Sequence, residues 1–336
     1  MFKIYLSNRD ENINAIDFYV KTIEDGIKQT GNDVCRVSKL GDILAEDIVV
    51  TLDAHSFFSV WRRNRKQKII NWFQGVAPEE IYYRNHNITG YFRMKIWNIF
   101  EKIALKYSFL NFFVSEEMVL HMYSKHKYDA TNYILMPCFN QEIHLESFYI
   151  EKYQVPSFVY TGSLLKWQCF DKTISLFLKI RQHLPNATLT ILTNDVDNAR
   201  IKLDESGLLD VEAKSVPYME LNRELSKYKY GFLIREDMLI NNVATPTKMS
   251  SYLSCGLIPV YSAVIKDFDK NLSFMKWGIK DLGNSDELIK QLVSLENVDI
   301  RLEELINDYK LIFDSYYNRS RYVQKISSYL NENCIS

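Results

Sequence analysis

The feature that most constrains the fold is a repeated alternation between short apolar stretches and longer stretches with helical periodicity. A short apolar stretch bounded by turn residues predicts a buried strand, and apolar residues three or four positions apart predict a helix. Strands that alternate with helices along a chain form parallel sheets covered by helices. The sequence therefore predicts an α/β protein.

The alternation runs through the chain twice. In the first run the expected strands are FKIYL, DVCRV, DIVVTL, KIINWF, NFFVS and YILMP, and the expected helices are Ile16–Gln29, Ile96–Lys106 and Glu116–Lys125. In the second run the expected strands are PSFVYTG, ATLTILT, VEAKSV, YGFLI and LIPVY, and the expected helices are Asp171–His183, Ala199–Gly207 and Glu220–Lys227.

A chain of 336 residues suits two domains of ordinary size. We expect Rossmann-like domains over residues 1–150 and 151–310, facing each other across a cleft. The stretch Arg301–Asn331 is amphipathic and helical, and we expect residues 311–336 to form a helix that returns to the first domain.

Composition and charge exclude several classes of protein. The net charge is −1, so the chain has no general attraction to nucleic acid. Its five cysteines are scattered without a CxxC pair, which indicates neither a zinc site nor a disulfide framework and favours a reducing, cytoplasmic compartment. The first residues, MFKIYLSNRD, predict a strand rather than a signal peptide.

One helix of the second run carries a cation at an unusual place. In ATPTKMSSYLSCGLIPVYS, Thr245 is a good N-cap, Pro246 suits the first helical position and Gly256 ends the helix. Lys248 then lies in the first turn, where the helix dipole favours anions over cations. A phosphate bound between the helix and the lysine would resolve this conflict, and an exposed helix lysine is the alternative.

The loops that follow the strands of the second run are rich in polar and turn residues. In open parallel sheets, ligands bind outside the carboxyl ends of the strands. The loops concerned are TGSLLKW, TNDVDN, PYME and REDMLINNVATPTK. We therefore expect these four loops to meet at one edge of the second sheet.

Several segments resemble a known family. YTGSLLKWQCFD and GFLIREDMLINNVATPTKMSSYLSCGLIPV are similar to the donor-site segments of GT-B glycosyltransferases of the family 4-like kind, which build bacterial polysaccharides and glycans. NWFQGVAPEE and FFVSEEMVLHM are similar to segments of the acceptor domain in the same group. The resemblance covers most of the chain. It implies a GT-B fold, a nucleotide-sugar donor with UDP-sugars favoured, a glycan acceptor and no cofactor.

The resemblance implies a donor site in the second domain, and the residue types suit its chemistry. A departing diphosphate gains negative charge, which fixed cations and backbone N–H groups stabilise. Arg235 and Lys248 are the expected catalytic cations, although Arg235 can instead form a structural ion pair with Glu236 or Asp237. The expected donor-binding residues are Gly162, Ser163, Lys166, Tyr218, Glu236, Asn241, Pro246, Thr247 and Ser251. The alternatives are a solvated loop lysine at Lys166, loop capping by Glu236 and Asn241, and a packed surface tyrosine at Tyr218.

The sequence departs from the family pattern at several positions. Many retaining members carry a Glu-x₇-Glu pair, and Val243 and Ser251 stand at the corresponding positions. The Arg and Lys often found after the first glycine are Ser163 and Gln168, and LSNRDEN replaces the Gly-Gly loop after the first strand. Ser251 puts the usual contact with the ribose in doubt.

Candidate acceptor-side residues follow two strands of the first domain. Asp53 and His55 come just after DIVVTL, and Gln74 and Gly75 come after KIINWF; Arg84 completes the expected acceptor-binding set with Gln74 and Gly75. A histidine often precedes this glycine in relatives, and Gln74 cannot act as a base. An inverting reaction would use Asp53 or His55 as the base, whereas in a retaining reaction the leaving phosphate can take the proton. A packing role for His55 is the alternative.

The pair Asp195 and Asp197 matches the DxD that binds a metal in GT-A glycosyltransferases. It lies within the second domain beside turn residues, so we interpret it as a turn. Without it the chain has no carboxylate cluster suited to a metal, and we expect a metal-independent site.

Residues 62–106 carry ten Lys or Arg and three Asp or Glu, a net charge of +7, interleaved with aromatic residues. This mixture suits peripheral contact with the headgroup layer of a membrane, near a lipid-linked acceptor. The longest apolar run in the first half of the chain is too short to span a bilayer. Buried aromatic residues and a solvated basic helix are the alternative explanation.

We therefore expect a hexosyltransferase-type glycosyltransferase in bacterial cell-surface polysaccharide or glycoconjugate assembly, cytoplasmic and working at the inner face of the cytoplasmic membrane. Two alternatives stay open. One is a non-catalytic GT-B-fold accessory subunit that binds a partner glycosyltransferase, and the other is a nucleotide-sugar epimerase of the same fold. The missing Glu pair favours the accessory subunit, whereas Arg235 and Lys248 argue for catalysis.

Overall fold

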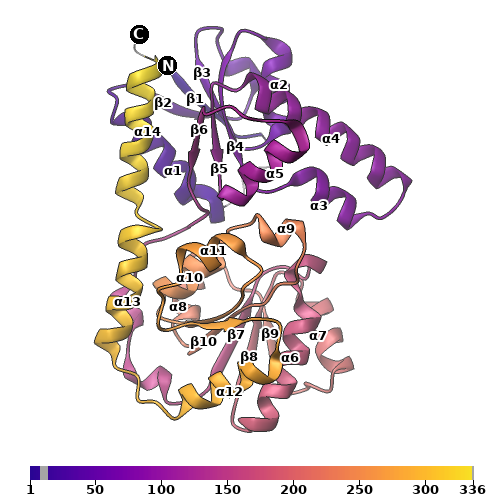
Figure 1. Ribbon diagram of the computed structural model, residues 1–336, viewed down its shortest axis with the longest axis vertical. Coiled ribbons are helices and arrows are strands. Elements are labelled where there is room, and N and C mark those ends of the chain that lie inside the picture. Colours follow the sequence, from indigo (N-terminus) through magenta and orange to yellow (C-terminus); the bar gives the residue numbers. More distant parts are fainter. Residues whose placement is uncertain (8–13, 335–336) are drawn as a thin grey trace. The chain divides into compact units, whose positions relative to one another are not determined.

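The computed structural model describes residues 1–7 and 14–334 as parts of two compact units (Figure 1). The N-terminal unit consists of residues 1–138, 243–245 and 318–336, and the C-terminal unit of residues 139–242 and 246–317. Most of the loop LSNRDEN lies outside the described residues.

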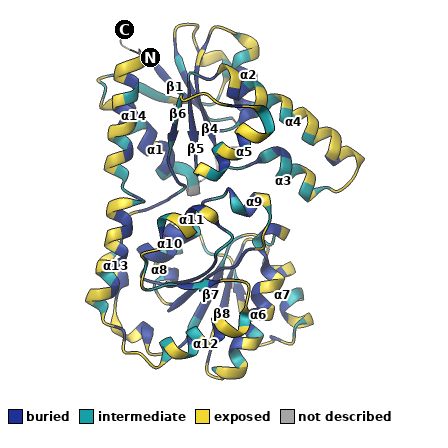
Figure 2. Cartoon of the chain, in the orientation of Figure 1, coloured by how far each residue is buried: buried dark blue, intermediate teal, exposed yellow. Residues whose placement is uncertain are grey.

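The N-terminal unit is built on a six-stranded parallel sheet with the strand order β2-β1-β3-β4-β5-β6. Its strands are β1 (Phe2–Tyr5), β2 (Val34–Val37), β3 (Ile48–Thr51), β4 (Lys68–Phe73), β5 (Leu110–Phe113) and β6 (Tyr133–Leu135). Its helices are α1 (Asn14–Lys28), α2 (Ala54–Arg63), α3 (Ala77–Arg84), α4 (Ile88–Tyr107), α5 (Glu116–His126) and α14 (Arg319–Cys334). The central strands are almost entirely buried, as expected for a parallel sheet with helices on both faces (Figure 2).

The C-terminal unit contains a second six-stranded parallel sheet, with the order β12-β11-β10-β7-β8-β9. Its strands are β7 (Ser157–Thr161), β8 (Thr188–Leu192), β9 (Glu212–Lys214), β10 (Tyr230–Leu233), β11 (Ile258–Ser262) and β12 (Ile279–Asp281). Its helices are α6 (Phe170–His183), α7 (Val196–Glu205), α8 (Leu221–Leu225), α9 (Leu239–Asn242), α10 (Lys248–Ser254), α11 (Lys266–Asn271), α12 (Ser285–Glu296) and α13 (Leu302–Ser315). The predicted α/β architecture with two parallel sheets is confirmed.

The segment that precedes β7 belongs to the C-terminal unit from Phe139 onward, earlier than the expected boundary at residue 150. Side chains in this segment account for the difference. Asn140 exchanges hydrogen bonds with the hydroxyls of Ser250 and Ser251, and Lys152 donates to the backbone O of Cys255 at 2.6 Å. The segment therefore packs on α10 and its C-terminus rather than serving as a bare connection.

The stretch Arg301–Asn331 forms two helices, α13 and α14, rather than one. Asn318 separates them, because its Oδ1 accepts from the backbone N of Arg321 and so caps the start of α14. α14 then lies along α1 within the N-terminal unit, where a Cβ on Gly26 would come within 2.6 Å of Ile326. Only a glycine at position 26 allows the two helices to approach this closely.

Candidate functional site

Arg235 follows β10 at the carboxyl end of the second sheet, and its side chain is buried at 2% exposure. Its guanidinium donates from Nη1 to the backbone O of Gln168 at 3.0 Å and from Nη2 to Gln168 Oε1 at 2.6 Å. Its backbone N donates to Ser262 Oγ at 2.9 Å, which ties the loop to the end of β11. Arg235 is thus held rigidly and aimed at the loop after β7.

Lys248, the first residue of α10, reaches the same place from another element. Its Nζ donates to Gln168 Oε1 at 2.7 Å and lies 4.7 Å from the ring centroid of Tyr160, a residue of β7. The two cations therefore converge on one amide oxygen. Within the described part of the chain, neither Arg235 nor Lys248 forms an ion pair with a carboxylate.

Gly162, just after β7, makes this approach sterically possible. Its φ is +133°, and a Cβ there would stand 2.5 Å from Lys248 Nζ and 2.6 Å from Cε. Any other residue would be strained and would push the ammonium away. The backbone N of Gly162 donates to the O of Leu192 at 2.9 Å, which fixes the turn against the neighbouring strand β8.

The electrostatics of the pair are unfavourable in isolation. Burial lowers the pKa of Lys248 well below its ordinary value, and the charge on Arg235 lowers it further. Burial also lowers the pKa of Arg235. Two neighbouring cations with only an amide oxygen between them are a site that an oxyanion would neutralise.

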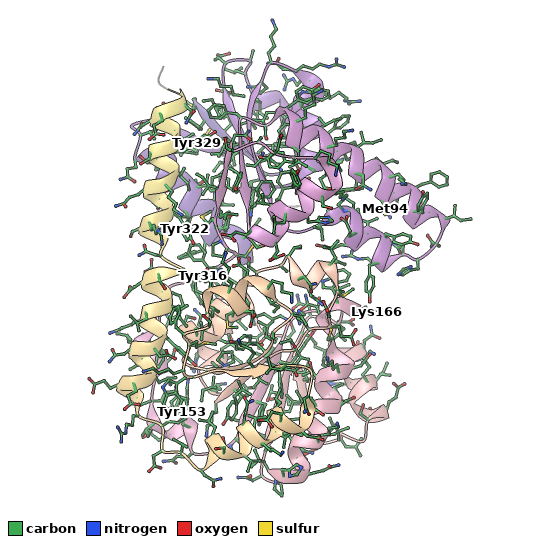
Figure 3. All side chains as sticks on the ribbon, in the orientation of Figure 1. Met94, Tyr153, Lys166, Tyr316, Tyr322 and Tyr329 are labelled. Atoms are coloured by element: carbon green, nitrogen blue, oxygen red, sulfur yellow. The ribbon has the colours of Figure 1, made fainter. Side chains whose placement is uncertain are left out.

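The other expected donor-binding residues all belong to the same C-terminal unit. Ser163 and Lys166 are exposed on the loop between β7 and α6, where Figure 3 labels Lys166. The backbone O of Ser163 accepts from the Tyr160 hydroxyl at 2.7 Å. Tyr218 begins a short 3₁₀ turn after β9 and is partly buried.

The loop after Arg235 is braced from inside. Asn241 is buried at 2% exposure, and its Nδ2 donates to the backbone O of Glu236 at 3.0 Å. The carboxylate of Glu236 is exposed, and neither it nor Asp237 pairs with Arg235 among the described residues. The sequence left open a structural ion pair for Arg235, and the structure shows an amide partner instead.

The start of α10 differs from the expectation. The helix begins at Lys248, with Thr247 in the N-cap position but without a side-chain capping bond, and Pro246 precedes it. The prediction of Thr245 as the N-cap is wrong, because its Oγ1 instead accepts from the backbone N of Cys138 at 2.9 Å. Gly256 ends the helix as predicted, with φ of +70°.

Ser251 is buried at 5% exposure on α10, and its hydroxyl is already engaged. Its single hydroxyl hydrogen has two acceptors within reach, Asn140 Oδ1 at 3.1 Å and the O of Thr247 at 3.2 Å, and its Oγ accepts from Asn140 Nδ2 at 3.0 Å. Sequence reasoning missed Asn140, which lies 111 residues away and has no neighbouring motif.

The N-terminal unit contains a separate pocket of about 440 Å³ at the carboxyl ends of β3 and β4. Its lining includes Asp53, Gln74, Gly75, Glu80 and Trp97. Three of these are predicted acceptor-side residues, so the structure brings Asp53, Gln74 and Gly75 together. The predicted Arg84 lies in the last turn of α3 and does not line the pocket.

Asp53 is the N-cap of α2, a helix that the sequence analysis did not predict. Its Oδ1 accepts from the backbone N of His55 at 2.7 Å and of Ser56 at 2.8 Å, and its Oδ2 accepts from Ser56 Oγ at 2.9 Å. The His55 ring stacks on Trp97, with centroids 5.7 Å apart. Gln74 Nε2 donates to the O of Leu52 at 2.9 Å.

Glu80 is a pocket residue that sequence reasoning missed. It lies one turn into α3, and its carboxylate packs against Gly75, where a Cβ would be 2.5 Å from Glu80 Oε1. Burial raises the pKa of Glu80, although the nearby Arg84 opposes the shift. Its spacing from Gly75 was visible in NWFQGVAPEE, but only a helix starting at Ala77 turns Glu80 back toward the glycine.

The described residues contain no group of three or more His, Cys, Asp or Glu side chains placed to hold a metal ion. Asp195 occupies the N-cap position of α7, and its Oδ1 accepts from Asn198 Nδ2 at 2.8 Å; Asp197 lies in the first turn of that helix. Among the described helices, none combines the length and apolar character needed to cross a membrane.

No protein-family model matches the sequence, and comparison with curated proteins finds no match. Solved structures do resemble it. Sucrose-phosphate synthase from Thermosynechococcus elongatus is 12% identical, with a TM-score of 0.72 over 100% of this chain and 99% of that one. Anabaena HepE, solved in complex with UDP, is 10% identical, with a TM-score of 0.68 over 99% and 100%.

Staphylococcus aureus TarM, also solved with UDP, is 12% identical, with a TM-score of 0.63. The match covers 85% of this chain and 55% of TarM, so the chain spans about half the length of that protein. At these identities the likeness concerns the fold. Two parallel sheets flanked by helices, matched over the whole chain, show that this protein has the GT-B fold.

Proposed function

We propose that the protein is a glycosyltransferase that moves a sugar from a nucleotide-sugar, with UDP-sugars favoured, to a glycan acceptor. The observation that carries the proposal is the convergence of Arg235 and Lys248 on Gln168 Oε1 without a carboxylate partner in the described structure. The UDP in solved structures of the same fold, HepE and TarM, supports the choice of nucleotide.

The cation pair suits the leaving group of such a reaction. As the bond between the sugar carbon and the diphosphate oxygen breaks, negative charge accumulates on the diphosphate. Fixed positive charges that need no reorganisation stabilise that charge. Arg235 is immobilised by four hydrogen bonds that it donates, three from its guanidinium and one from its backbone N. The bound diphosphate would also raise the lowered pKa of Lys248 and so restore the positive charge of this side chain.

We propose that the reaction needs no metal, because two protein cations do the neutralising. Transfer should then survive EDTA. Loss of activity with EDTA, restored by Mn²⁺ or Mg²⁺, would count against this and would return attention to Asp195 and Asp197.

The acceptor is proposed to bind in the N-terminal pocket beside Gln74 and Gly75. If the reaction inverts, a base must take the proton of the acceptor hydroxyl. Of the expected candidates, Asp53 already accepts three hydrogen bonds as a helix cap and His55 stacks on Trp97. Glu80 lines the same pocket, and we add it as a candidate for the base.

We place this activity in bacterial cell-surface polysaccharide or glycoconjugate assembly, with a lipid-linked acceptor and a hexosyl donor, in the cytoplasm at the inner face of the membrane. WaaG, a glycosyltransferase involved in lipopolysaccharide biosynthesis, has a similar structure at 10% identity and supports this placement.

A second candidate function is a non-catalytic accessory subunit. It is favoured by position 251, where a serine that is bonded to Asn140 stands in place of a carboxylate. An accessory subunit would lack turnover when purified alone, but it would gain no benefit from a cation pair that is buried without a counter-ion.

The test is thermal unfolding in the presence of UDP-, GDP-, CMP- and dTDP-sugars. A ligand at ~100 times its dissociation constant adds about 2.7 kcal/mol to the free energy of unfolding, which is readily measured. Stabilisation by one nucleotide, followed by transfer of its sugar, would establish the activity. Stabilisation without turnover would favour the accessory subunit, and no stabilisation by any nucleotide would contradict both the donor site and the proposed function.

A further inference from the structure

α4 exposes a row of large apolar side chains on one side. Ile88, Phe92, Ile96 and Ile99 are 77%, 62%, 50% and 57% exposed. Their spacing of three or four residues places them on a single helical face. Single exposed apolar residues are common on protein surfaces, but a contiguous row of four on one helix marks an interaction site.

The opposite side of α4 faces its own unit. Gly90, Glu101, Ala104 and Leu105 are buried there. α3 and α4 extend outward from the sheet of the N-terminal unit, and the outer side of α4 is exposed along its length (Figure 2). Figure 3 labels Met94 on this helix, and Met94 itself is partly buried.

The charged side chains of α4 are also divided between an exposed side and a buried side. Arg93, Lys95, Lys102 and Lys106 are all exposed. The one acid in the helix, Glu101, is 2% exposed and pairs with Lys125 at 2.6 Å and His126 at 2.9 Å. The charge that α4 presents to its surroundings is therefore entirely positive.

We propose that this α4 outer face, formed by Ile88, Phe92, Ile96 and Ile99 with the four flanking cations, docks on an anionic lipid bilayer. The apolar row would lie at the boundary between headgroups and acyl chains, and the cations would contact lipid phosphates. The consequence that a lipid-linked acceptor is brought to the enzyme rests on the proposed function; the docking itself does not.

Two features of the face select a bilayer over a second copy of the chain. In a symmetric dimer the α4 outer face of one copy would pack against the same face of the other copy, which would bring like charges together. An anionic bilayer offers acyl chains to the apolar row and negatively charged headgroups to the cations. Within the basic window 62–106 the exposed large apolar side chains lie mainly on α4, although Arg62, Arg63, Arg65, Lys66 and Lys68 are exposed as well. Bilayer contact is therefore assigned to α4, the helix that combines exposed cations with an exposed apolar row.

The experiment is co-sedimentation of the full chain with phosphatidylcholine vesicles that contain or lack phosphatidylglycerol, at low and high salt. One variant combines Phe92→Ser with Ile96→Ser, and its control combines Leu120→Ser with Tyr123→Ser, which are 58% and 53% exposed on α5 of the same unit. A second variant combines Lys95→Glu with Lys102→Glu, and its control combines Lys290→Glu with Lys310→Glu, both exposed in the C-terminal unit.

We expect binding to the anionic vesicles only, weakened by salt. Each cation near an anionic surface contributes about a fivefold gain in partitioning, so removal of two should cost about 25-fold or more. The serine variant should also lose binding, and both controls should keep it. UDP-induced thermal stabilisation, measured on the same proteins, should be unchanged in every variant, which separates this inference from the donor-site proposal.

Three outcomes would overturn the proposal. The first is failure of the unmodified protein to bind anionic vesicles at low salt. The second is equal binding by the α4 variants and their controls. The third is a concentration-dependent dimer, measured by light scattering, that the α4 variants abolish, because a second copy would then be the occupant of the face.

Discussion

Arg235 and Lys248 donate to the same atom, Oε1 of Gln168, at 2.6 and 2.7 Å. The two donors come from different elements, the end of β10 and the start of α10, and meet over the turn that follows β7. A neutral amide oxygen can orient two cations but cannot neutralise them. The apo site is therefore preorganised for an anion, and this relationship makes the donor-site proposal testable.

Lys248→Met should weaken nucleotide binding without unfolding the protein. A hydrogen bond from a charged donor contributes about 1.5–3 kcal/mol, so affinity should fall roughly tenfold to a hundredfold. Because the pKa of Lys248 is lowered, its charge is unfavourable in the apo fold, and the free energy of unfolding should stay the same or rise. Calorimetric titration with UDP and urea denaturation would measure the two effects. Lys290→Met, at an exposed lysine of α12 in the same unit, is the control and should keep the affinity. Equal affinity of Lys248→Met and the unmodified protein for UDP would contradict the phosphate role of Lys248.

Gly162→Ala should reproduce the binding defect through geometry rather than charge. At φ of +133° an alanine is strained, which costs about 1–3 kcal/mol of stability, and its Cβ would displace the Lys248 ammonium. Nucleotide affinity should fall although both cations remain. Gly41→Ala is the control, because Gly41 has ordinary φ and open space around its Cβ position. Normal UDP affinity in a folded Gly162→Ala protein would show that the Lys248 position does not matter.

The sequence predicted the strands well because the signal for a buried parallel strand is local. DIVVTL and YGFLI are nearly uniform apolar runs, and both became central strands. β12, with the sequence IKD, was missed because its identity as a strand depends on pairing with β11 rather than on its own composition. α2 was not predicted, because Asp53 and His55 were considered only as candidate site residues after a strand, whereas Asp53 caps a helix there.

The place of Lys248 in the first turn of a helix was predicted for a similar reason, since Pro-Thr-Lys and Gly256 mark that helix within a short stretch. Arg235 was expected beside it from the family resemblance and from the chemistry of the leaving group. Their partner was not predictable. Gln168 was identified only as a substitution for a family cation, and its amide lies 67 residues from Arg235 and 80 from Lys248. The same limit explains why Thr245 was wrongly predicted as the N-cap: its hydroxyl accepts from the backbone N of Cys138, 107 residues away. Partners of this kind depend on tertiary packing that no local pattern encodes.

Lys152 should make stability rise with pH above neutrality. It is 5% exposed, donates to the backbone O of Ser147 and Cys255, and has no carboxylate partner in the described structure. Burial lowers its pKa from 10.5 to about 7. Between these values the unfolded chain binds the extra proton, so the free energy of unfolding increases with pH, by up to about 1.4 kcal/mol per pH unit.

Urea denaturation from pH about 7 upward measures this slope. Lys152→Met keeps the apolar stem and removes the titrating group, so it should flatten the slope while lowering stability by about 1–3 kcal/mol through two unsatisfied carbonyls. Lys310→Met, on the exposed side of α13, is the control and should leave the slope unchanged. An identical slope in Lys152→Met and the unmodified protein would contradict the assignment.

We expect Glu80 to lower the free energy of unfolding at neutral pH and to contribute to catalysis. Because burial raises its pKa above the ordinary 4.5, the folded state favours the neutral carboxyl, and the associated stability is lost as pH rises through the raised pKa. Glu80→Gln should therefore leave the free energy of unfolding at neutral pH unchanged or higher. If Glu80 is the base, the same variant should lower kcat roughly 10²–10⁴-fold and remove the acidic limb of the pH–rate profile.

The neighbouring Glu79 supplies the control for that experiment. Its Oε1 lies 3.1 Å from His121 Nε2 and 2.7 Å from Lys125 Nζ, and these partners lower its pKa against the effect of burial. Glu79→Gln should thus lose stability but keep the pH–rate profile, the reverse of Glu80→Gln. The two adjacent carboxylates of α3 would then have different roles, a structural one for Glu79 and a catalytic one for Glu80. A retained kcat in Glu80→Gln, with the acidic limb in place, would rule out Glu80 as the base and leave Asp53, His55 or the leaving phosphate to take the proton.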